Sequence, residues 1–202
     1  MTQAELDIVA DPRIVPSRKL PGRVTALGIA DGEGFRTRGV ATLDLGLDGI
    51  PGDRHAGFTR RSGSREPWYR RETEMRSGRQ LSIVSEEELE QVRRAMDLPR
   101  LEAGWIGANI VTAGLPRLSF LPIGTRLFVD GEAVLVVEGQ NAPCRYAGRS
   151  IAEAYPERSG LDLLFPQVAK RLRGVIATVE RAGAISTGAA FTAKLPEQWI
   201  YG

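Results

Sequence analysis

The chain of 202 residues has the composition of an ordinary globular protein, with 42% hydrophobic, 26% charged and 6% aromatic residues and a formal net charge of +2. So small a positive excess does not indicate nucleic-acid binding. Its one cysteine excludes an internal disulfide and an all-cysteine metal site, and suits a reducing compartment. The N-terminus lacks the basic region of a signal peptide, and no segment approaches the ~20 apolar residues that span a bilayer. We therefore expect a cytoplasmic protein that binds neither nucleic acid nor a membrane.

Arginine dominates the basic residues: all but Lys19, Lys170 and Lys194 of the 27 are arginines. A GC-rich genome would explain most of this bias. Between residues 54 and 79, however, eight arginines stand against three glutamates. Guanidinium groups bind phosphates and carboxylates through paired hydrogen bonds, so this local excess predicts an anion site.

The first third of the chain predicts strands and then a long loop. Alternating apolar residues at 23–30 and 39–45 indicate two strands. From 49 to 78 the periodicity disappears and Gly, Arg, Ser and Pro accumulate. Loops of this length in a compact domain are usually functional or mobile, and this one carries the arginine excess.

A strand at 80–84 leads into a helix with a clear start signal. Ser85 and Glu88 form a capping box, in which each side chain would bind the other residue's amide. The amphipathic pattern that follows predicts a helix to about Met96.

The middle of the chain predicts a further strand and a hairpin. Glycines flank the segment 104–112, which should enter a strand. Two β-prone runs within 125–138 surround an Asp130-Gly131 turn, the pattern of a hairpin that delivers the chain to Cys144.

Beyond Arg149 we expect a short helix to about Tyr155 and an apolar segment at 161–172 interrupted by Pro166. A last strand pair around 174–179 should turn within 180–185.

These elements predict one mixed, mainly β domain. Short strands at regular spacing with few helices favour a β-barrel. We divide the chain into a lead-in at 1–22, the domain at 23–190 and a tail at 191–202.

Two residues are candidates for chemistry. Cys144 follows Pro143 and has Arg145 and Arg149 nearby, and fixed cations favour the thiolate, the form that attacks electrophiles and binds metals. An unpaired cysteine is otherwise a small buried apolar residue. His55, the one histidine, lies between arginine and glycine; it is either an ordinary loop residue, an anion contact or a base paired with Cys144, as in a Cys-His hydrolase.

Two further residues are candidates for the same cleft. Arg79 precedes a predicted strand, and its side chain could point into this cleft. Asn109 is either a turn residue or a polar contact of a ligand. A two-histidine zinc site is excluded, and the sequence contains no Gly-Lys-Ser/Thr phosphate loop.

Five motifs, in order and spacing, resemble the MOSC family, named after the C-terminal domain of molybdenum cofactor sulfurase. They are Gly-Ile-Pro-Gly-Asp-Arg-His-Ala-Gly (49–57), Arg-Gln-Leu-Ser-Ile-Val (79–84), Gly-Ala-Asn-Ile (107–110), Leu-Pro-Ile-Gly-Thr-Arg-Leu (121–127) and Ala-Pro-Cys-Arg (142–145). The resemblance covers roughly residues 23–186 and is that of a free-standing member. It implies a MOSC-type β-barrel with a few appended α-helices, and molybdenum cofactor as the bound group.

The resemblance also implies residue roles. Cys144 would ligate molybdenum or carry a persulfide, and Arg54, Arg79 and Arg145 would bind the cofactor's anionic group. His55, with a catalytic role beside Cys144, and Asn109 would contact pterin or substrate. Ala108 departs from the family, where many members have an acid, so no carboxylate acts at that position.

Two functions follow from the resemblance. The first is reduction of a small N-hydroxylated substrate, with electrons from a separate donor protein because one cysteine cannot hold a cysteine-ligated cluster. The second is sulfur transfer, in which Cys144 takes a persulfide from a cysteine desulfurase.

Overall fold

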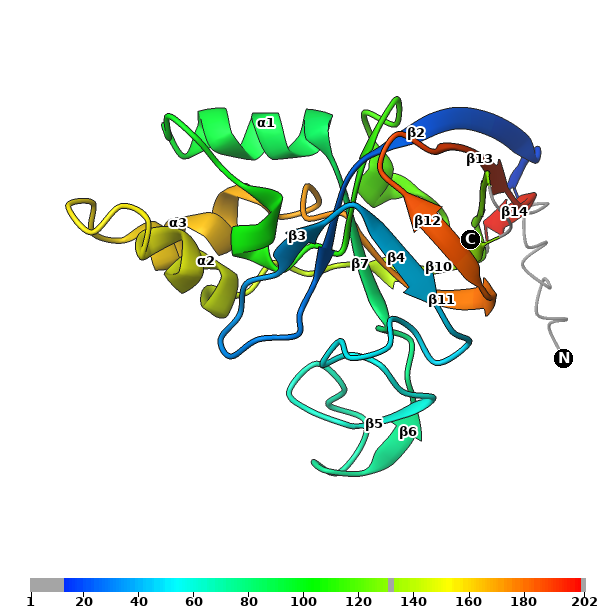
Figure 1. The fold of residues 1–202 in the computed structure, drawn as a ribbon, viewed down its shortest axis with the longest axis horizontal. Helices are drawn as coiled ribbons and strands as arrows, with labels where there is room; N and C mark the ends of the chain where they lie inside the picture. The colour runs from blue at the N-terminus through cyan, green and yellow to red at the C-terminus, as the bar shows by residue number, and fades with distance from the viewer. Residues whose placement is uncertain (1–12, 131–132, 201–202) are drawn as a thin grey trace, which may run out of the picture.

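The structure, a computed structural model, describes residues 13–130 and 133–200. A barrel forms its centre, three helices flank it, and a small arm, residues 58–77, projects from it (Figure 1). The barrel strands are β2 (Arg18–Ile29), β7 (Leu81–Ser85), β8 (Ile110–Ala113), β9 (Arg126–Val129), β10 (Val134–Gln140), β11 (Val175–Arg181) and β13 (Ala190–Leu195). The other strands are β1 (Arg13–Val15), β3 (Arg38–Val40), β4 (Thr42–Leu45), β5 (Thr59–Arg61), β6 (Glu74–Arg76), β12 (Gly183–Ser186) and β14 (Gln198–Ile200). The helices are α1 (Glu86–Ala95), α2 (Arg145–Ala152) and α3 (Leu161–Val168), with 3₁₀ turns η1 (Ala103–Ile106) and η2 (Leu118–Phe120).

The barrel closes because β2 pairs with β8 on one side and with β13 on the other. The strands follow one another in the order β13, β9, β10, β11, β7, β8 and β2. Neighbours are antiparallel except β7 and β8, which run parallel. Closure satisfies the edge amides that an open sheet would expose. The predicted mainly β barrel with a few appended helices is confirmed.

Strand β7 shows how one wall separates two cores. Leu81 and Ile83 point into the barrel, whereas Val84 packs in a second core formed with the helices. Alternation along the strand places Ser82 on the same outer face as Val84. The barrel wall thus presents a polar side chain where the helical core ends.

The helical core is built by α1, η1, α2 and α3. Val92 of α1, Ile151 of α2 and Phe165 of α3 are at most 1% exposed. Helices α2 and α3 approach closely at Gly148, where a Cβ atom would lie 2.6 Å from the carbonyl oxygen of Asp162.

Half of the predicted capping box is present. The Ser85 hydroxyl accepts a hydrogen bond from the Glu88 N–H at 3.2 Å, and α1 ends at Ala95, one residue before the predicted Met96. The Glu88 carboxylate, however, accepts hydrogen bonds from the amide and hydroxyl of Ser119. Its expected bond to Ser85 is therefore wrong, because a distant part of the chain offers two donors.

The C-terminal strand prediction needs two corrections. Strand β11 continues to Arg181 and β12 begins at Gly183, so the turn predicted to occupy 180–185 is wrong. Strand β12 pairs with β4, not with β11. The chain leaves the barrel sheet at this point and forms a separate two-stranded sheet, whose Leu43, Leu45 and Ile185 pack in the barrel core.

Two predicted segments are more divided than expected. The segment 39–45 contains most of β3 and all of β4, and the loop 49–78 contains the β5–β6 hairpin. The predicted hairpin of β9 and β10 is present, but Gly131 of its turn lies outside the described residues.

The short helix expected after Arg149 begins earlier, at Arg145, directly after Cys144. The apolar segment at 161–172 contains α3, which includes Pro166.

The predicted domain borders fall inside strands. Strand β2 crosses residue 22 and β13 crosses residue 190, so the barrel uses residues from the lead-in and the tail. The division into lead-in, domain and tail stays a prediction. Within the described part of the chain, no helix is long and apolar enough to cross a membrane.

Candidate functional site

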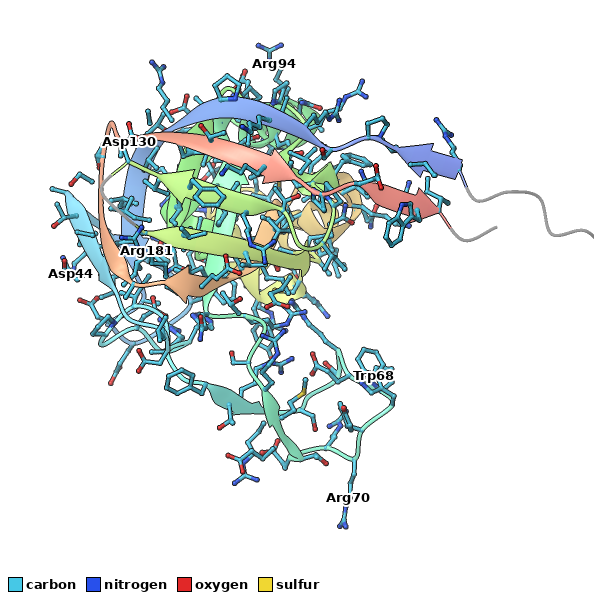
Figure 2. The ribbon with its side chains drawn as sticks, turned by 90° about the vertical axis from the view of Figure 1, so that its right-hand side faces the viewer. Asp44, Trp68, Arg70, Arg94, Asp130 and Arg181 are labelled. Carbon is cyan, nitrogen blue, oxygen red and sulfur yellow. The ribbon has the colours of Figure 1, made fainter. Side chains whose placement is uncertain are left out.

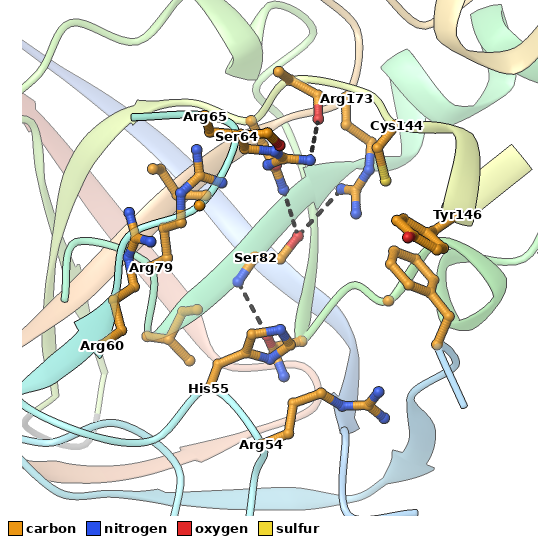
Figure 3. A pocket seen from close by; sticks show the side chains of 18 of the residues that line it. Arg54, His55, Arg60, Ser64, Arg65, Arg79, Ser82, Cys144, Tyr146 and Arg173 are labelled. Atoms are coloured by element: carbon orange, nitrogen blue, oxygen red, sulfur yellow. Dashed lines mark hydrogen bonds between the residues drawn. The ribbon is translucent and has the colours of Figure 1, made fainter. Parts of the chain in front are cut away.

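A cavity of about 430 Å³ opens beside the barrel, between the outer face of β7 and β11, the arm and the start of α2. Six arginines line it: Arg54, Arg60, Arg61, Arg65, Arg79 and Arg173. Figure 3 shows Arg60 and Arg79 on one side of Ser82, with Cys144 and Tyr146 on the other. Glu66 is the one carboxylate among its lining residues. This imbalance of charge suits an anionic ligand.

Glu66 is already occupied by protein contacts. Arg60 donates to both of its carboxylate oxygens, at 2.5 and 3.3 Å, and the Gly63 N–H donates at 3.0 Å. Arg79 lies 3.9 Å away. The hydrogen bonds from Arg60 are the main reason that the pKa of Glu66 is lowered to about 2. Glu66 thus stays ionised, and one carboxylate cannot neutralise the other guanidinium groups.

Burial disfavours the charged form of two of the arginines. Burial lowers the pKa of Arg79 to about 10, with a further contribution from Arg65 and Arg60. Burial also lowers the pKa of Arg173 to about 10, and a thiolate at Cys144 would oppose this change at both guanidinium groups. These cations would be stabilised by an anion in the cavity, including a thiolate at Cys144.

Cys144 occupies the N-cap position of α2, and its side chain makes no capping hydrogen bond. It is partly exposed and lines the cavity. The segment before it is fixed: the Asn141 N–H donates to the Gly174 carbonyl, and the Asn141 side chain donates to Ser82 Oγ. Arg65 also donates to the Ala142 carbonyl at 3.3 Å. The thiol is therefore presented to the cavity by a braced segment at the positive end of a helix.

His55 is oriented by a buried carboxylate. Asp53 accepts hydrogen bonds from the His55 N–H at 2.8 Å and from His55 Nδ1 at 2.9 Å. Burial alone would raise the pKa of Asp53, but hydrogen bonds from His55 and Ala30 outweigh it and lower the pKa to about 2. Since Nδ1 faces Asp53, Nε2 is the ring nitrogen left for a ligand.

Asn109 completes this network instead of reaching outward. Its amide nitrogen donates to Asp53 at 2.9 Å and to the Gly28 carbonyl at 3.2 Å. Its oxygen accepts from the Ser82 N–H. Both amide hydrogens are thus used within the protein, and Asn109 ties the histidine loop to β7.

The cavity brings together Arg54, His55, Arg79, Asn109 and Cys144, five residues singled out from the sequence. Arg145 is not among its lining residues: its Nε atom donates to Asp162 at 2.8 Å. Ala108 is buried in the helical core and offers no polar side chain.

The sequence did not point to Arg173. It is 4% exposed and donates to Ser82 Oγ at 3.1 Å and to the Ile106 carbonyl. Its one local signal is its position, because Arg173 is a charged residue directly before a glycine and an apolar strand. Arg60, Arg61 and Arg65 lie within the predicted arginine-rich segment but carry no individual signal.

No group of three or more His, Cys, Asp or Glu side chains within the described residues could hold a bare metal ion. The cavity itself offers one thiol and one histidine. A metal bound here would therefore have to bring other ligands with it.

These features define a barrel protein with one thiol beside an arginine-lined cavity. Residues 58–192 match the MOSC domain, and the chain belongs to this family. It is 39% identical over 171 residues to YuaD of Bacillus subtilis (strain 168), provisionally named a metal-sulfur cluster biosynthesis protein. That match covers 85% of this chain and 89% of YuaD.

Solved structures agree with the fold. The crystal structure of Bacillus subtilis YuaD has a TM-score of 0.87 and 37% identity, with 89% of this chain and 98% of that chain covered. YiiM from Geobacillus stearothermophilus has a TM-score of 0.58 at 16% identity, covering 85% of this chain and 74% of its own. At that identity YiiM shows the shared fold alone.

Proposed function

We propose that this MOSC protein binds molybdenum cofactor in the arginine-lined cavity and reduces N-hydroxylated compounds, with the Cys144 thiolate as a molybdenum ligand. One observation carries the proposal: the one thiol of the chain lines the same cavity as six guanidinium groups and a single carboxylate.

The donor groups fit this cofactor. Molybdenum cofactor is a pterin with a phosphate and two sulfur atoms that bind the metal. Guanidinium groups suit the phosphate, and a thiolate suits a metal already bound by sulfur. Arg60 Nε is buried and has no hydrogen-bond partner among the described residues. A cavity of about 430 Å³ lies within the ordinary range of ligand sites, roughly 300–1,000 Å³.

Each residue has a distinct task in this proposal. Arg79 and Arg173 would hold the anionic part of the cofactor, and Cys144 would bind the metal. His55, with Nδ1 fixed by Asp53, can carry a proton at Nε2 to the leaving hydroxyl group. When bound, the cofactor supplies two-electron chemistry.

Reduction of an N–OH group consumes two electrons and two protons and releases an amine and water. The chain has one cysteine and therefore cannot hold a cysteine-ligated iron-sulfur cluster. A separate electron-transfer protein would supply the electrons.

Elemental analysis of protein from a cofactor-competent host tests the proposal. We expect stoichiometric molybdenum in the wild type and little in Cys144→Ser, whose melting behaviour should show that it still folds. A molybdenum-free wild type with a free Cys144 thiol would overturn the proposal.

The second candidate function is sulfur transfer. It is favoured by the provisional name of YuaD and by the Cys144 thiol, which is partly exposed and makes no capping hydrogen bond to α2. The Cys144 thiolate would attack the outer sulfur of a cysteine desulfurase persulfide and release the desulfurase thiolate. Mass spectrometry should then detect one added sulfur on the wild type and none on Cys144→Ser. An unmodified wild type would count against this function.

A Cys-His hydrolase has less support. No hydrogen bond joins Cys144 to His55 in the described part of the chain, whereas the Asp53 contact of His55 is present. Labelling of Cys144 by an acyl-directed probe, lost in His55→Ala, would revive it.

A further inference from the structure

The arm, residues 58–77, ends in a loop that exposes two large aromatic side chains. The exposed fraction is 71% for Trp68 and 45% for Tyr69. Their ring centroids lie 6.3 Å apart. Figure 2 shows Trp68 at the side of the arm and Arg70 at its far end, with Arg70 directed away from the barrel. Adjacent exposed aromatic side chains on a projecting loop are typical of an interaction site.

The loop is held in shape by buried polar groups, so the exposure of its aromatic residues is built into the fold. Ser62 is 1% exposed; its hydroxyl donates to the Arg70 carbonyl and accepts from the Thr73 N–H. Glu66 is 5% exposed, and its carbonyl accepts from the Tyr69 N–H. An ordered loop loses little conformational entropy when it binds a partner.

The charge of the loop is positive where the aromatic rings are exposed. Arg70 and Arg71 are both exposed, and in the described residues no hydrogen bond or ion pair engages their guanidinium groups. Glu66 is neutralised by Arg60, which leaves Glu72 as the one exposed carboxylate between β5 and β6. Adjacent exposed Trp, Tyr and Arg side chains are the types that dominate binding energy at protein interfaces.

The same loop also borders the cavity. Ser64 and Arg65 line it, and Arg65 donates to the Ala142 carbonyl, two residues before Cys144. A partner seated on residues 68–71 would therefore contact a loop that reaches the segment carrying the thiol.

We propose that residues 68–71 form a docking surface for an acidic electron-transfer protein. This inference rests on the proposed function, because N-hydroxyl reduction needs an external electron donor. Complementary charge would steer the donor to the arm, and the aromatic side chains would be buried on contact.

Single-stranded nucleic acid can also bind exposed aromatic rings beside arginines. The net charge of +2 and the confinement of the pattern to one loop favour a protein partner. The experiment includes nucleic acid as a competing outcome.

Binding of the full chain to a flavodoxin and to a [2Fe–2S] ferredoxin, both acidic electron carriers, tests the inference by titration. We expect at least one of the two carriers to bind the wild type, with an affinity that falls as the salt concentration rises. Trp68→Ala and the double variant Arg70→Ala, Arg71→Ala should each weaken binding about tenfold or more. Trp199→Ala is the matched control, because Trp199 on β14 is also 71% exposed; it should bind as the wild type does.

Three outcomes would overturn the docking surface: no binding to either carrier, equal losses in Trp68→Ala and Trp199→Ala, or tight binding of single-stranded oligothymidine that competes with the carriers. Unchanged melting temperatures would show that the variants fold. Protein that carries molybdenum but binds neither carrier would contradict this inference alone. Protein that binds a carrier but holds no molybdenum would contradict the cofactor proposal alone.

Discussion

The buried carboxylate of Asp53 stabilises the site by accepting hydrogen bonds from several donors. Its side chain is fully buried and accepts hydrogen bonds from Ala30, His55 and Asn109. A pKa lowered from 3.8 to about 2 corresponds to about 2 kcal/mol of stability. Because the folded state holds the lower pKa, this stability is complete above pH 3.8 and disappears as the pH falls through about 2.

Asp53→Asn should therefore lower the free energy of unfolding by about 2 kcal/mol at neutral pH. Its deficit relative to the wild type should shrink as the pH falls below about 4. Urea denaturation of both proteins across this range measures the effect. Asp44→Asn is the control, since Asp44 is exposed on β4 and should change little. A deficit that does not vary with pH would contradict a role for the ionised carboxylate.

Residues of the site could be predicted from the sequence where their signal lies in their own type or in their near neighbours. Cys144 and His55 are single occurrences of reactive types, and the arginine excess near His55 is visible as a count. Arg173 is different: it reaches the cavity because β11 lies next to β7, and its partner Ser82 is 91 residues away. No local pattern encodes that contact.

The same limit applies to elements. The start of α1 was predictable because Ser85 and the Glu88 amide are neighbours in the chain. The start of α2 was not, because its N-cap residue, Cys144, makes no capping hydrogen bond. Gly148 inside α2 also weakens the helical pattern, although its lack of a side chain is what allows α3 to approach.

Gly148→Ala tests that approach, because propensity and packing predict opposite signs. Alanine is about 1 kcal/mol better than glycine in a helix interior. A Cβ atom at this position would lie 2.6 Å from the Asp162 carbonyl oxygen and 2.8 Å from its Cα, and backbone cannot move aside cheaply. We expect a net loss of about 1–3 kcal/mol in thermal or urea unfolding.

Gly39→Ala provides the comparison, since a Cβ atom at that position on β3 would have no atom of the described chain within 4 Å beyond its two sequence neighbours. It should be near neutral. A stabilised Gly148→Ala would show that the two helices separate without cost.

For the whole molecule, barrel closure depends on contacts between the two ends of the described chain. Strand β2 pairs with β13, so that Arg23 lies opposite Ala190. Alternation could predict individual strands, but it could not predict this pairing or the parallel pair of β7 and β8. The barrel was inferred from strand spacing and from the order of the MOSC motifs, which reflects the whole chain.

Closure also gathers positive charge from distant segments into one cavity, and that concentration has a global consequence. Arg79 and Arg173 keep their protons although burial lowers both pKa values to about 10. An anion that binds only the folded state should relieve this cost and raise the melting temperature.

Inorganic pyrophosphate at about 100 times its dissociation constant would add ~2.7 kcal/mol, or roughly 5–10 °C for a chain of this size. At millimolar concentration, sodium chloride of equal ionic strength should not reproduce the rise. Arg79→Gln should show a clearly smaller rise than Arg13→Gln, which removes an exposed arginine of β1. Equal rises in the two variants would mean that pyrophosphate binds elsewhere and that the cavity charge does not govern the stability of the fold.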